Sequence, residues 1–292
     1  MELETETMRE NKPLLSIVMA VYNSGEYLRE SIESVLSQTY THFEFIIVND
    51  DSSDGSEGII REYAAKDKRV VYLKNDANLR QSETRNKAIR LAKGEMIAIV
   101  DSDDICVVDR FERQVNFFNE NPDTDVLGTD YCIFFNDTVK ECDSVVSANA
   151  DDIYDAKPPV HNPTCLMKKN VFMQYGYYDS KYDNAEDVEL WFRWFSQGVR
   201  FANLHEVLYK KRTHEGSVSI SKIMDQIYLM LKVDMIAIFR NHIRFTRKGY
   251  LHVLEQLFYL VYLFLKLDRL YVRNKVVHNI KRRAQRSGSA VN

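Results

Sequence analysis

The chain has 292 residues, enough for one sizeable domain with an appendage. Hydrophobic residues make up 45% and charged residues 28%, which is ordinary for a globular protein with a real core. The net charge of -4 is too small to indicate a strongly acidic or basic partner. The charge is unevenly spread, because residues 240–292 contain 12 Lys and Arg against Glu255 and Asp268, which leaves -14 on the rest.

Four cysteines occur in the chain, at Cys106, Cys132, Cys142 and Cys165. They form no CxxC pair, and in a chain of this length they predict a reducing compartment rather than a disulfide framework. The first twelve residues are polar and acidic, unlike a signal peptide. The longest apolar run, residues 257–265, is shorter than the ~20 residues that a membrane-spanning helix needs. We therefore expect a cytoplasmic protein.

Strands and helices are predicted to alternate over the first hundred residues. Short apolar runs predict buried strands at 14–21, 43–48, 70–73 and 96–100. Helical patterns lie between them, near 26–38, 56–66 and 81–92. This order predicts an α/β fold with a Rossmann-like, mostly parallel sheet flanked by helices. Ligands of such sheets bind beyond the carboxyl ends of the strands, here after residues 21, 48 and 100.

The later sequence is less regular. Residues 105–215 mix short strands with two helices, near 109–120 and 186–197. Beyond about residue 220 the pattern is helical throughout.

Two aspartates follow the strand at 96–100. Alternate side chains of an extended segment share a side, so Asp101 and Asp103 point the same way. Two carboxylates can hold Mg²⁺ or Mn²⁺ and leave positions open for phosphate oxygens and water. The alternative is a polar turn that caps the next helix, but the position at a strand end favours a metal site.

Polar residues also follow the first two strands. Asp50 lies nearest the end of the second strand, where it could accept a hydrogen bond from a base or ribose. Asp54 is better explained as a helix cap. At the end of the first strand, Tyr22 and Asn23 offer a ring face and an amide beside a nucleotide, or else form a purely structural loop.

Five motifs occur in order in this half of the chain: Ser16–Asn23 (SIVMAVYN), Ser37–Tyr40 (SQTY), Val48–Gly55 (VNDDSSDG), Thr84–Asn86 (TRN) and Asp101–Asp104 (DSDD). Together they resemble the family 2 glycosyltransferases, which have the GT-A fold. Later motifs extend the resemblance to about residue 220. It implies a catalytic domain over 1–220, with a nucleotide-binding half at 1–110 and an acceptor-binding half at 111–220. The helical, basic extension at 221–292 is not covered.

The resemblance also implies roles for individual residues. Tyr22 and Asp50 would contact the nucleotide base, and Asp101 the ribose or phosphates. Asp103 would bind the divalent metal, Mn²⁺ or Mg²⁺, that bridges the diphosphate. Arg85 would face the donor phosphates or sugar.

Three positions depart from the family pattern on the donor side. Asn49 replaces the first Asp of the family's pair, and Asp51 replaces its Gly. Arg80 stands where many members have Gly. The identity of the donor sugar is therefore left open.

The segment Asn184–Trp191 (NAEDVELW) resembles the family's Glu-Asp-x-x-Leu-Trp motif at a helix start. It implies that Asp187 is the general base that removes the acceptor proton. Glu186 and Trp191 would then lie on the acceptor side. The alternative is that these acidic residues only favour a helix N-terminus through the helix dipole.

Two histidines belong to later motifs. His161 resembles a His-Pro-Thr segment near the acceptor, with Asn162 inserted, or is a plain loop histidine. The run Lys211–His214 (KRTH) resembles the family's Tyr-Arg-x-His, with Lys in place of Tyr. His214 would complete the metal shell or contact the diphosphate, and Arg212 would neutralise phosphate charge. The alternative is that both are surface groups.

The resemblance implies inverting transfer of a single sugar from a nucleotide-diphosphate donor, most commonly a UDP-sugar. The acceptor would be a hydroxyl of a glycan or lipid-linked saccharide, as in cell-surface polysaccharide biosynthesis. A Gln-x-x-Arg-Trp segment, typical of processive synthases, is absent. Alternatives are transfer to a polyprenyl phosphate, or a non-catalytic nucleotide-binding or scaffold protein.

Residues 251–270 are apolar on more than one face and are surrounded by basic residues. One hypothesis is peripheral attachment of residues 240–292 to the anionic inner face of the cell membrane. The alternative is packing on the catalytic domain or on a second subunit in a homodimer. Nucleic-acid binding is not expected.

Overall fold

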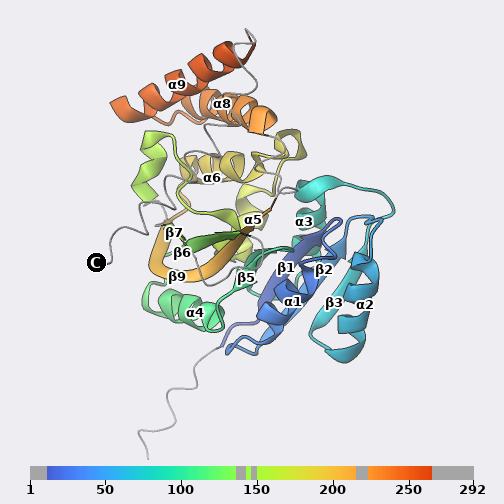
Figure 1. Cartoon of the computed structure of the whole chain (residues 1–292). Helices are drawn as coiled ribbons and strands as arrows, with labels where there is room; N and C mark the ends of the chain where they lie inside the picture. The colour runs from blue at the N-terminus through green and yellow to red at the C-terminus, as the bar shows by residue number, and fades with distance from the viewer. Residues whose placement is uncertain (1–11, 136–142, 146–149, 215–222, 265–292) are drawn as a thin grey trace, which may run out of the picture.

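The computed structural model describes residues 12–135, 143–145, 150–214 and 223–264, and Figure 1 shows how their elements are arranged. The strands are β1 Leu15–Val21, β2 Phe43–Asn49, β3 Val70–Lys74, β4 Met96–Asp101, β5 Ile105–Cys106, β6 Val126–Phe135, β7 Asp143–Val145, β8 Leu166–Lys168 and β9 Phe201–Thr213. The α-helices are α1 Leu28–Leu36, α2 Ser56–Lys66, α3 Arg80–Leu91, α4 Arg110–Glu120, α5 Lys169–Tyr175, α6 Glu186–Ser196, α8 Ile223–Phe239 and α9 Arg247–Phe264. Short 3₁₀ helices are η1 Ala150–Asp155, η2 Asn162–Thr164 and η3 Ser180–Tyr182.

The strands described form one sheet in the order β3-β2-β1-β4-β8-β6-β9-β5, with β7 beside β6. The first four strands are parallel, as the sequence predicts. Their register places Val21 opposite Asn49 and Ala20 opposite Asp101. The loops that follow β1, β2 and β4 therefore leave the sheet at one edge.

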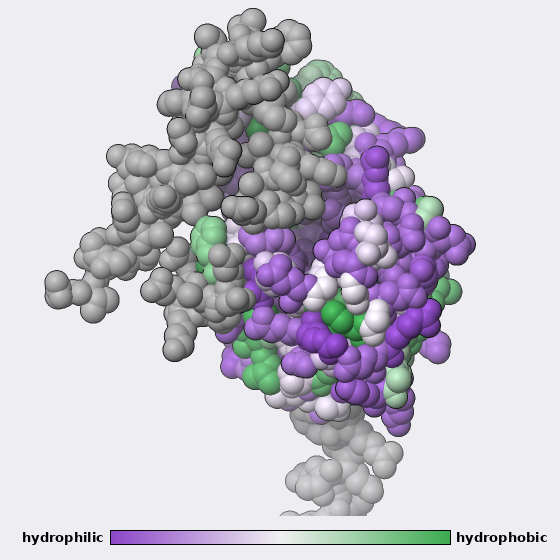
Figure 2. Space-filling model, turned by 45° about the vertical axis from the view of Figure 1, so that its right-hand side comes forward, coloured by the Kyte–Doolittle hydropathy of each residue, from purple (hydrophilic) through white to green (hydrophobic). Residues whose placement is uncertain are grey.

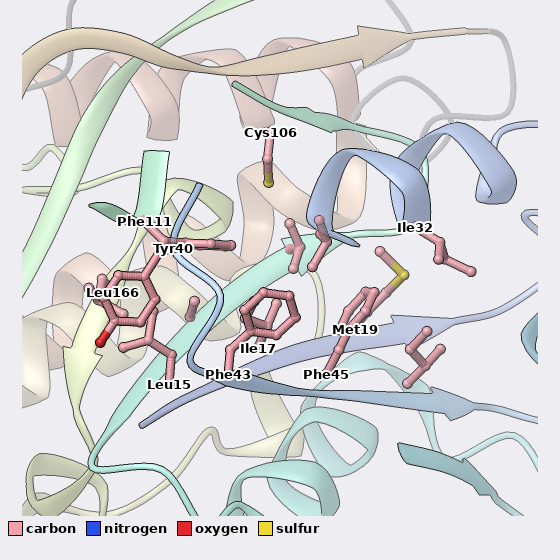
Figure 3. Close-up of a cluster of buried hydrophobic side chains, with 14 of the residues drawn as sticks. Leu15, Ile17, Met19, Ile32, Tyr40, Phe43, Phe45, Cys106, Phe111 and Leu166 are labelled. Carbon is pink, nitrogen blue, oxygen red and sulfur yellow. The ribbon is translucent and has the colours of Figure 1, made fainter. Parts of the chain in front are cut away.

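The strand β1 is buried on both faces, which explains its unbroken apolar sequence. On one face Ile17 and Met19 pack in a cluster with Phe45 and with Ile32 of α1 (Figure 3). Val18 points to the other face, into a second cluster that contains residues of α3, α5 and α6. Helices on both sides thus fix the parallel sheet in place.

The second half of the sheet is mixed. Strand β8 is antiparallel to β4 and β6, whereas β6 and β9 are parallel with register shifts between Thr129 and Tyr131. The prediction of short strands here is confirmed for β5, β7 and β8 but is wrong for β6, which has 10 residues, and β9, which has 13. The polar sequence of β9 carries little strand signal, and its pairing with β6 decides its length.

The described part of the C-terminal extension is a pair of helices. Val233 of α8 and Val253 of α9 share a buried cluster with Phe192 of α6 and Ile153 of η1. Within the part of the chain that the structure describes, no helix combines the length and apolar composition of a bilayer-spanning segment. The surface in Figure 2 is mostly hydrophilic, with scattered hydrophobic residues.

The cysteines only partly follow the expectation of reduced thiols. Cys106 and Cys165 are free and buried, but Cys132 is disulfide-bonded. Packing explains the two free thiols, since each belongs to a core cluster.

Candidate active site

A cleft of about 950 Å³ opens at the carboxyl ends of the parallel strands. Eleven of the twelve residues that the sequence predicts for the site line it: Tyr22, Asn23, Asp50, Arg85, Asp101, Asp103, His161, Glu186, Asp187, Arg212 and His214. These residues come from segments up to 192 positions apart, between Tyr22 and His214. The location is the one expected for an open α/β sheet.

The predicted metal ligands lie next to each other. The Nε2 atom of His214 is 3.1 Å from Oδ2 of Asp103, although 111 positions separate them. Burial, and next the charge of Asp101, raise the pKa of Asp103, so a cation there would stabilise its ionised form. Among the described residues, no group of three or more His, Cys, Asp and Glu side chains is placed to hold a metal. Two protein ligands nevertheless fit Mg²⁺ or Mn²⁺, whose remaining positions take phosphate oxygens and water.

Arg212, on β9, connects the Asp101–Asp104 turn to this strand by hydrogen bonds. Its backbone N–H donates to Oδ1 of Asp104 at 2.7 Å, and its Nε donates to the carbonyl oxygen of Asp103 at 2.9 Å. The guanidinium also pairs with Glu30 and is 2% exposed. Arg212 lines the cleft, and in this structure its charge is balanced by Glu30, so the neutralisation of phosphate charge by Arg212 stays a prediction.

Arg85 links the two halves of the cleft. Its Nη2 donates to Oδ1 of Asp101 at 2.9 Å, and its Nη1 donates to Oε1 of Glu186 at 2.8 Å. Burial opposes its charge, but these two carboxylates more than offset burial and raise the pKa of Arg85. Arg85 reaches the cleft, yet its two terminal nitrogens both bind carboxylates, a bridging role that the sequence motif did not reveal.

Glu186 and Asp187 open helix α6 at the cleft. Oε2 of Glu186 accepts a hydrogen bond from the backbone of Asn184 at 2.7 Å, so this carboxylate shapes the turn before the helix. Burial raises the pKa of Glu186 to about 7. Burial also raises the pKa of Asp187, and Arg85 opposes that rise. A carboxylate with a raised pKa that remains partly exposed to a cleft suits a general base.

The site geometry agrees with the comparisons with known proteins. A family model described as glycosyl transferase family 2 matches residues 16–176. The chain belongs to glycosyltransferase family 2. An uncharacterized glycosyltransferase of Methanocaldococcus jannaschii is 33% identical over 93% of this chain and 94% of its own length. The Escherichia coli enzyme WfaP, a UDP-Glc:α-D-GlcNAc-diphosphoundecaprenol β-1,3-glucosyltransferase, is 30% identical over 78% of this chain and 89% of its own.

Solved structures confirm the GT-A fold of this family 2 glycosyltransferase. The mannosyltransferase PcManGT from Pyrobaculum calidifontis, in complex with GDP-Man and Mn²⁺, has a TM-score of 0.65 at 15% identity, over 92% of this chain and 80% of that one. S. aureus TarS 1–349 with UDP-GlcNAc has a TM-score of 0.62 at 21% identity, over 87% and 73% of the two chains.

The loops of the glycosyltransferase that are predicted to bind the donor are held by their own polar groups. Oδ1 of Asp50 accepts hydrogen bonds from Nδ2 of Asn75 at 2.7 Å and from the backbone of Leu79 at 2.8 Å. Oδ1 of Asn23 accepts from the backbone of Ser53 at 2.9 Å. The amide oxygen of Asn23 therefore joins two loops instead of being free for a nucleotide. Tyr22 is 53% exposed, which leaves its ring available to a base.

The structure explains two of the departures from the family pattern. Asp51 has φ 58° and Arg80 has φ 63°, both in the left-handed region that glycine adopts without strain. The backbone therefore keeps the conformation that Gly would permit at these positions. Of the two side chains, that of Arg80 lines the cleft and adds a cation to it, whereas Asp51 lies outside its lining.

The predicted acceptor-side residues separate into two groups. His161 lines the cleft and stacks on Tyr131, with ring centroids 4.3 Å apart. Trp191 does not line it, so the acceptor-side assignment is corrected: this residue is fully buried and packs against Trp194 and Phe201. The reason is depth along the helix: Asp187 lies in the first turn of α6, which opens to the cleft, whereas Trp191 lies about 6 Å further along the axis and is covered by the core.

Proposed function

We propose that this enzyme transfers a single sugar, with inversion, from a nucleotide-diphosphate donor to a hydroxyl of a glycan or lipid-linked saccharide. One observation carries the proposal: Asp103 beside His214 and Asp187 on α6 line the same cleft, and Arg85 bridges the two sides. Such a cleft can hold a diphosphate at one side and an acceptor hydroxyl at the other.

The residues divide the reaction between them. Asp103 and His214 would hold Mg²⁺ or Mn²⁺, which supplies Lewis-acid stabilisation of the leaving diphosphate when bound. Asp187 would accept the proton of the acceptor hydroxyl, so that the oxygen attacks the anomeric carbon as the bond to phosphate breaks. Tyr22 and Asp50 would bind the base, and Asp101 the ribose or phosphates. Attack from the side opposite the leaving group inverts the anomeric centre.

UDP is the proposed nucleotide. WfaP uses UDP-Glc by name, and TarS was solved with UDP-GlcNAc, whereas PcManGT holds GDP-Man. A thermal-shift panel of UDP-, GDP- and dTDP-sugars, with and without Mn²⁺, tests the assignment. We expect one donor to raise the melting temperature only when Mn²⁺ is present. No stabilisation by any donor in Mn²⁺ would contradict the proposal.

We also propose a cytoplasmic enzyme whose catalytic domain extends to about residue 220 and whose helical extension contacts the inner face of the cell membrane. Exposed apolar side chains on the helix pair support the contact: Phe239 is 71%, Leu254 58% and Phe258 75% exposed. Arg244 and Arg247 are exposed nearby and suit anionic lipid. The competing occupant of this surface is a second copy of the chain.

Co-sedimentation with anionic and neutral vesicles tests the membrane contact. We expect binding only to the anionic vesicles, weakened by the double substitution Arg244→Gln and Arg247→Gln. Light scattering that shows a dimer, together with no vesicle binding, would assign the surface to the second copy.

A further inference from the structure

Lys211 is a cation of the cleft whose side chain makes no ion pair and no hydrogen bond within the part of the chain that the structure describes. It lies on β9, next to Arg212, and is partly buried. Among the residues that the structure describes, its ammonium group has no carboxylate within ion-pair distance and no hydrogen-bond acceptor. The carboxylates of Asp104 and Asp187 interact with this charge only at longer range, so a ligand that brings an anionic oxygen into contact with the partly buried ammonium would be favoured.

The other cations of the cleft differ from Lys211. Arg85 binds two carboxylates, Arg212 pairs with Glu30, and His214 contacts Asp103. Arg80 also has no carboxylate partner among the described residues, but its side chain is exposed and water can solvate it. Lys211 is therefore the shielded cation that remains available.

Lys211 lies on the side of the cleft where the acceptor would bind. Burial is the main cause that lowers the pKa of His161 and raises that of Asp187, and the charge of Lys211 acts on both groups. It is therefore within electrostatic reach of the proposed base. His161 adds a second unused group, since its Nε2 is buried and makes no hydrogen bond in the described structure.

The chemistry of Lys211 and His161 favours a ligand that carries an anionic oxygen. Lysine offers three N–H donors on a positive charge, and a neutral imidazole offers one more donor or acceptor. The donor diphosphate has its own site, since Asp103 and His214 lie together at the ends of β4 and β9. An anion on the acceptor, a few ångströms from the hydroxyl that meets Asp187, would lie within reach of Lys211.

We propose that Lys211 and His161 bind an anionic group of the acceptor, so that the enzyme selects saccharides with a phosphate or carboxylate near the reacting hydroxyl. The two sources of that charge are a glycosyl diphosphate, as in a lipid-linked sugar, and a uronic acid. The inference depends on the glycosyl transfer proposed above, because it assigns the acceptor of that reaction. The family motif has Tyr at this position, so the cation is a departure of this chain.

Binding is the first test and needs no turnover. Calorimetry on the full chain with UDP and Mn²⁺ compares three ligands: GlcNAc diphosphate with a short alkyl tail, methyl glucuronoside and neutral methyl GlcNAc. We expect one anionic ligand to bind at least about tenfold more tightly than the neutral one. Lys211→Gln should remove the preference, and Lys211→Arg should keep most of it.

Lys210→Gln is the matched control, because it removes the same charge from the adjacent β9 residue outside the cleft. It should bind all three ligands as the unsubstituted protein does. The inference is overturned if the unsubstituted protein does not prefer either anionic ligand. It is equally overturned if Lys211→Gln keeps the preference or if Lys210→Gln abolishes it.

Steady-state transfer separates the inference from the proposed function. With an anionic acceptor, Lys211→Gln should raise the acceptor KM at least about tenfold and leave the donor KM unchanged. A rise in donor KM instead would assign Lys211 to the diphosphate and overturn the inference. If no acceptor is glycosylated by the unsubstituted protein, the proposed function fails, while the calorimetric preference still decides whether the anion site exists.

Discussion

The two sides of the cleft are built differently. On the donor side, Tyr22 and Asp50 directly follow parallel strands and Asp101 ends one, so the sheet alone places them at one edge. Asp187, on the acceptor side, lies in the first turn of α6, and His214, which meets Asp103, follows a strand of the mixed part of the sheet. Their positions depend on long-range contacts such as the Arg85 bridge. The comparison suggests that donor binding and acceptor activation can be damaged separately.

We expect Asp187→Asn to separate sugar transfer from donor binding most clearly. Without a base, transfer should fall roughly a thousandfold, whereas stabilisation by the nucleotide-sugar and Mn²⁺ should persist because the donor side is untouched. Transfer assays and thermal shifts on one preparation measure both effects. Asp179→Asn, on the connection before α6 but outside the cleft, is the control and should keep normal transfer. Normal turnover in Asp187→Asn would remove the base assignment.

Breaking the link between the two sides should mainly affect stability. Arg85→Met leaves Asp101 and Glu186 without their buried counter-charge, so the free energy of unfolding should fall by about 3–5 kcal/mol. Urea unfolding measures it. Arg90→Met, on the exposed face of the same helix, should cost much less. Equal losses in the two variants would show that Arg85 does not hold the halves together.

The metal pair spans the boundary between the two regions. His214→Ala removes the ligand that β9 supplies, so the Mn²⁺ concentration for half-maximal transfer should rise at least about tenfold. His205→Ala is the control, because His205 also lies on β9 beside an aspartate but outside the cleft. Unchanged Mn²⁺ dependence in His214→Ala would assign this histidine another role.

Glu186 should give the acceptor side a pH-dependent stability. Burial raises its pKa from 4.5 to about 7, so the folded protein binds this proton more tightly than the unfolded chain. The contribution to stability is therefore full below the unfolded pKa and is lost as the pH rises towards 7. The unfolding free energy should fall by about 1 kcal/mol per pH unit relative to Glu186→Gln in that window. If the unfolding free energies of the unsubstituted protein and of Glu186→Gln change with pH in the same way, the raised pKa of Glu186 is contradicted.

The smallest expected effect is a change in stability at Arg80, in the loop predicted to bind the donor. At φ 63°, Arg80→Gly relieves backbone strain that Arg80→Ala retains, so the Gly variant should be more stable by about 1 kcal/mol. Thermal unfolding of the pair measures the difference, and both variants lose the same cation. Equal stability would mean that the loop relaxes around this residue.

The sequence determined the parallel half of the fold and the residues that follow its strands. Apolar runs with helices between them fix β1 to β4, because strands buried on both faces must be continuously apolar. Asp50, Asp101 and Asp103 could therefore be assigned to the cleft in advance. The motif at 184–191 likewise identified Asp187, although only as a resemblance.

The tertiary structure decided which of the predicted residues face the cleft and which of their charges are paired within the protein. Trp191 and Asp187 belong to one motif, but Asp187 lies in the first turn of α6 at the cleft, whereas Trp191 lies one turn further along the helix and is covered by the core. Arg85 and Arg212 look like phosphate ligands in the sequence, yet carboxylates from distant segments take up their charges. Lys211 has no such ion pair in the described structure, which is the basis of the anion site proposed for it. A linear sequence records which groups are charged, whereas only the fold determines which charges cancel.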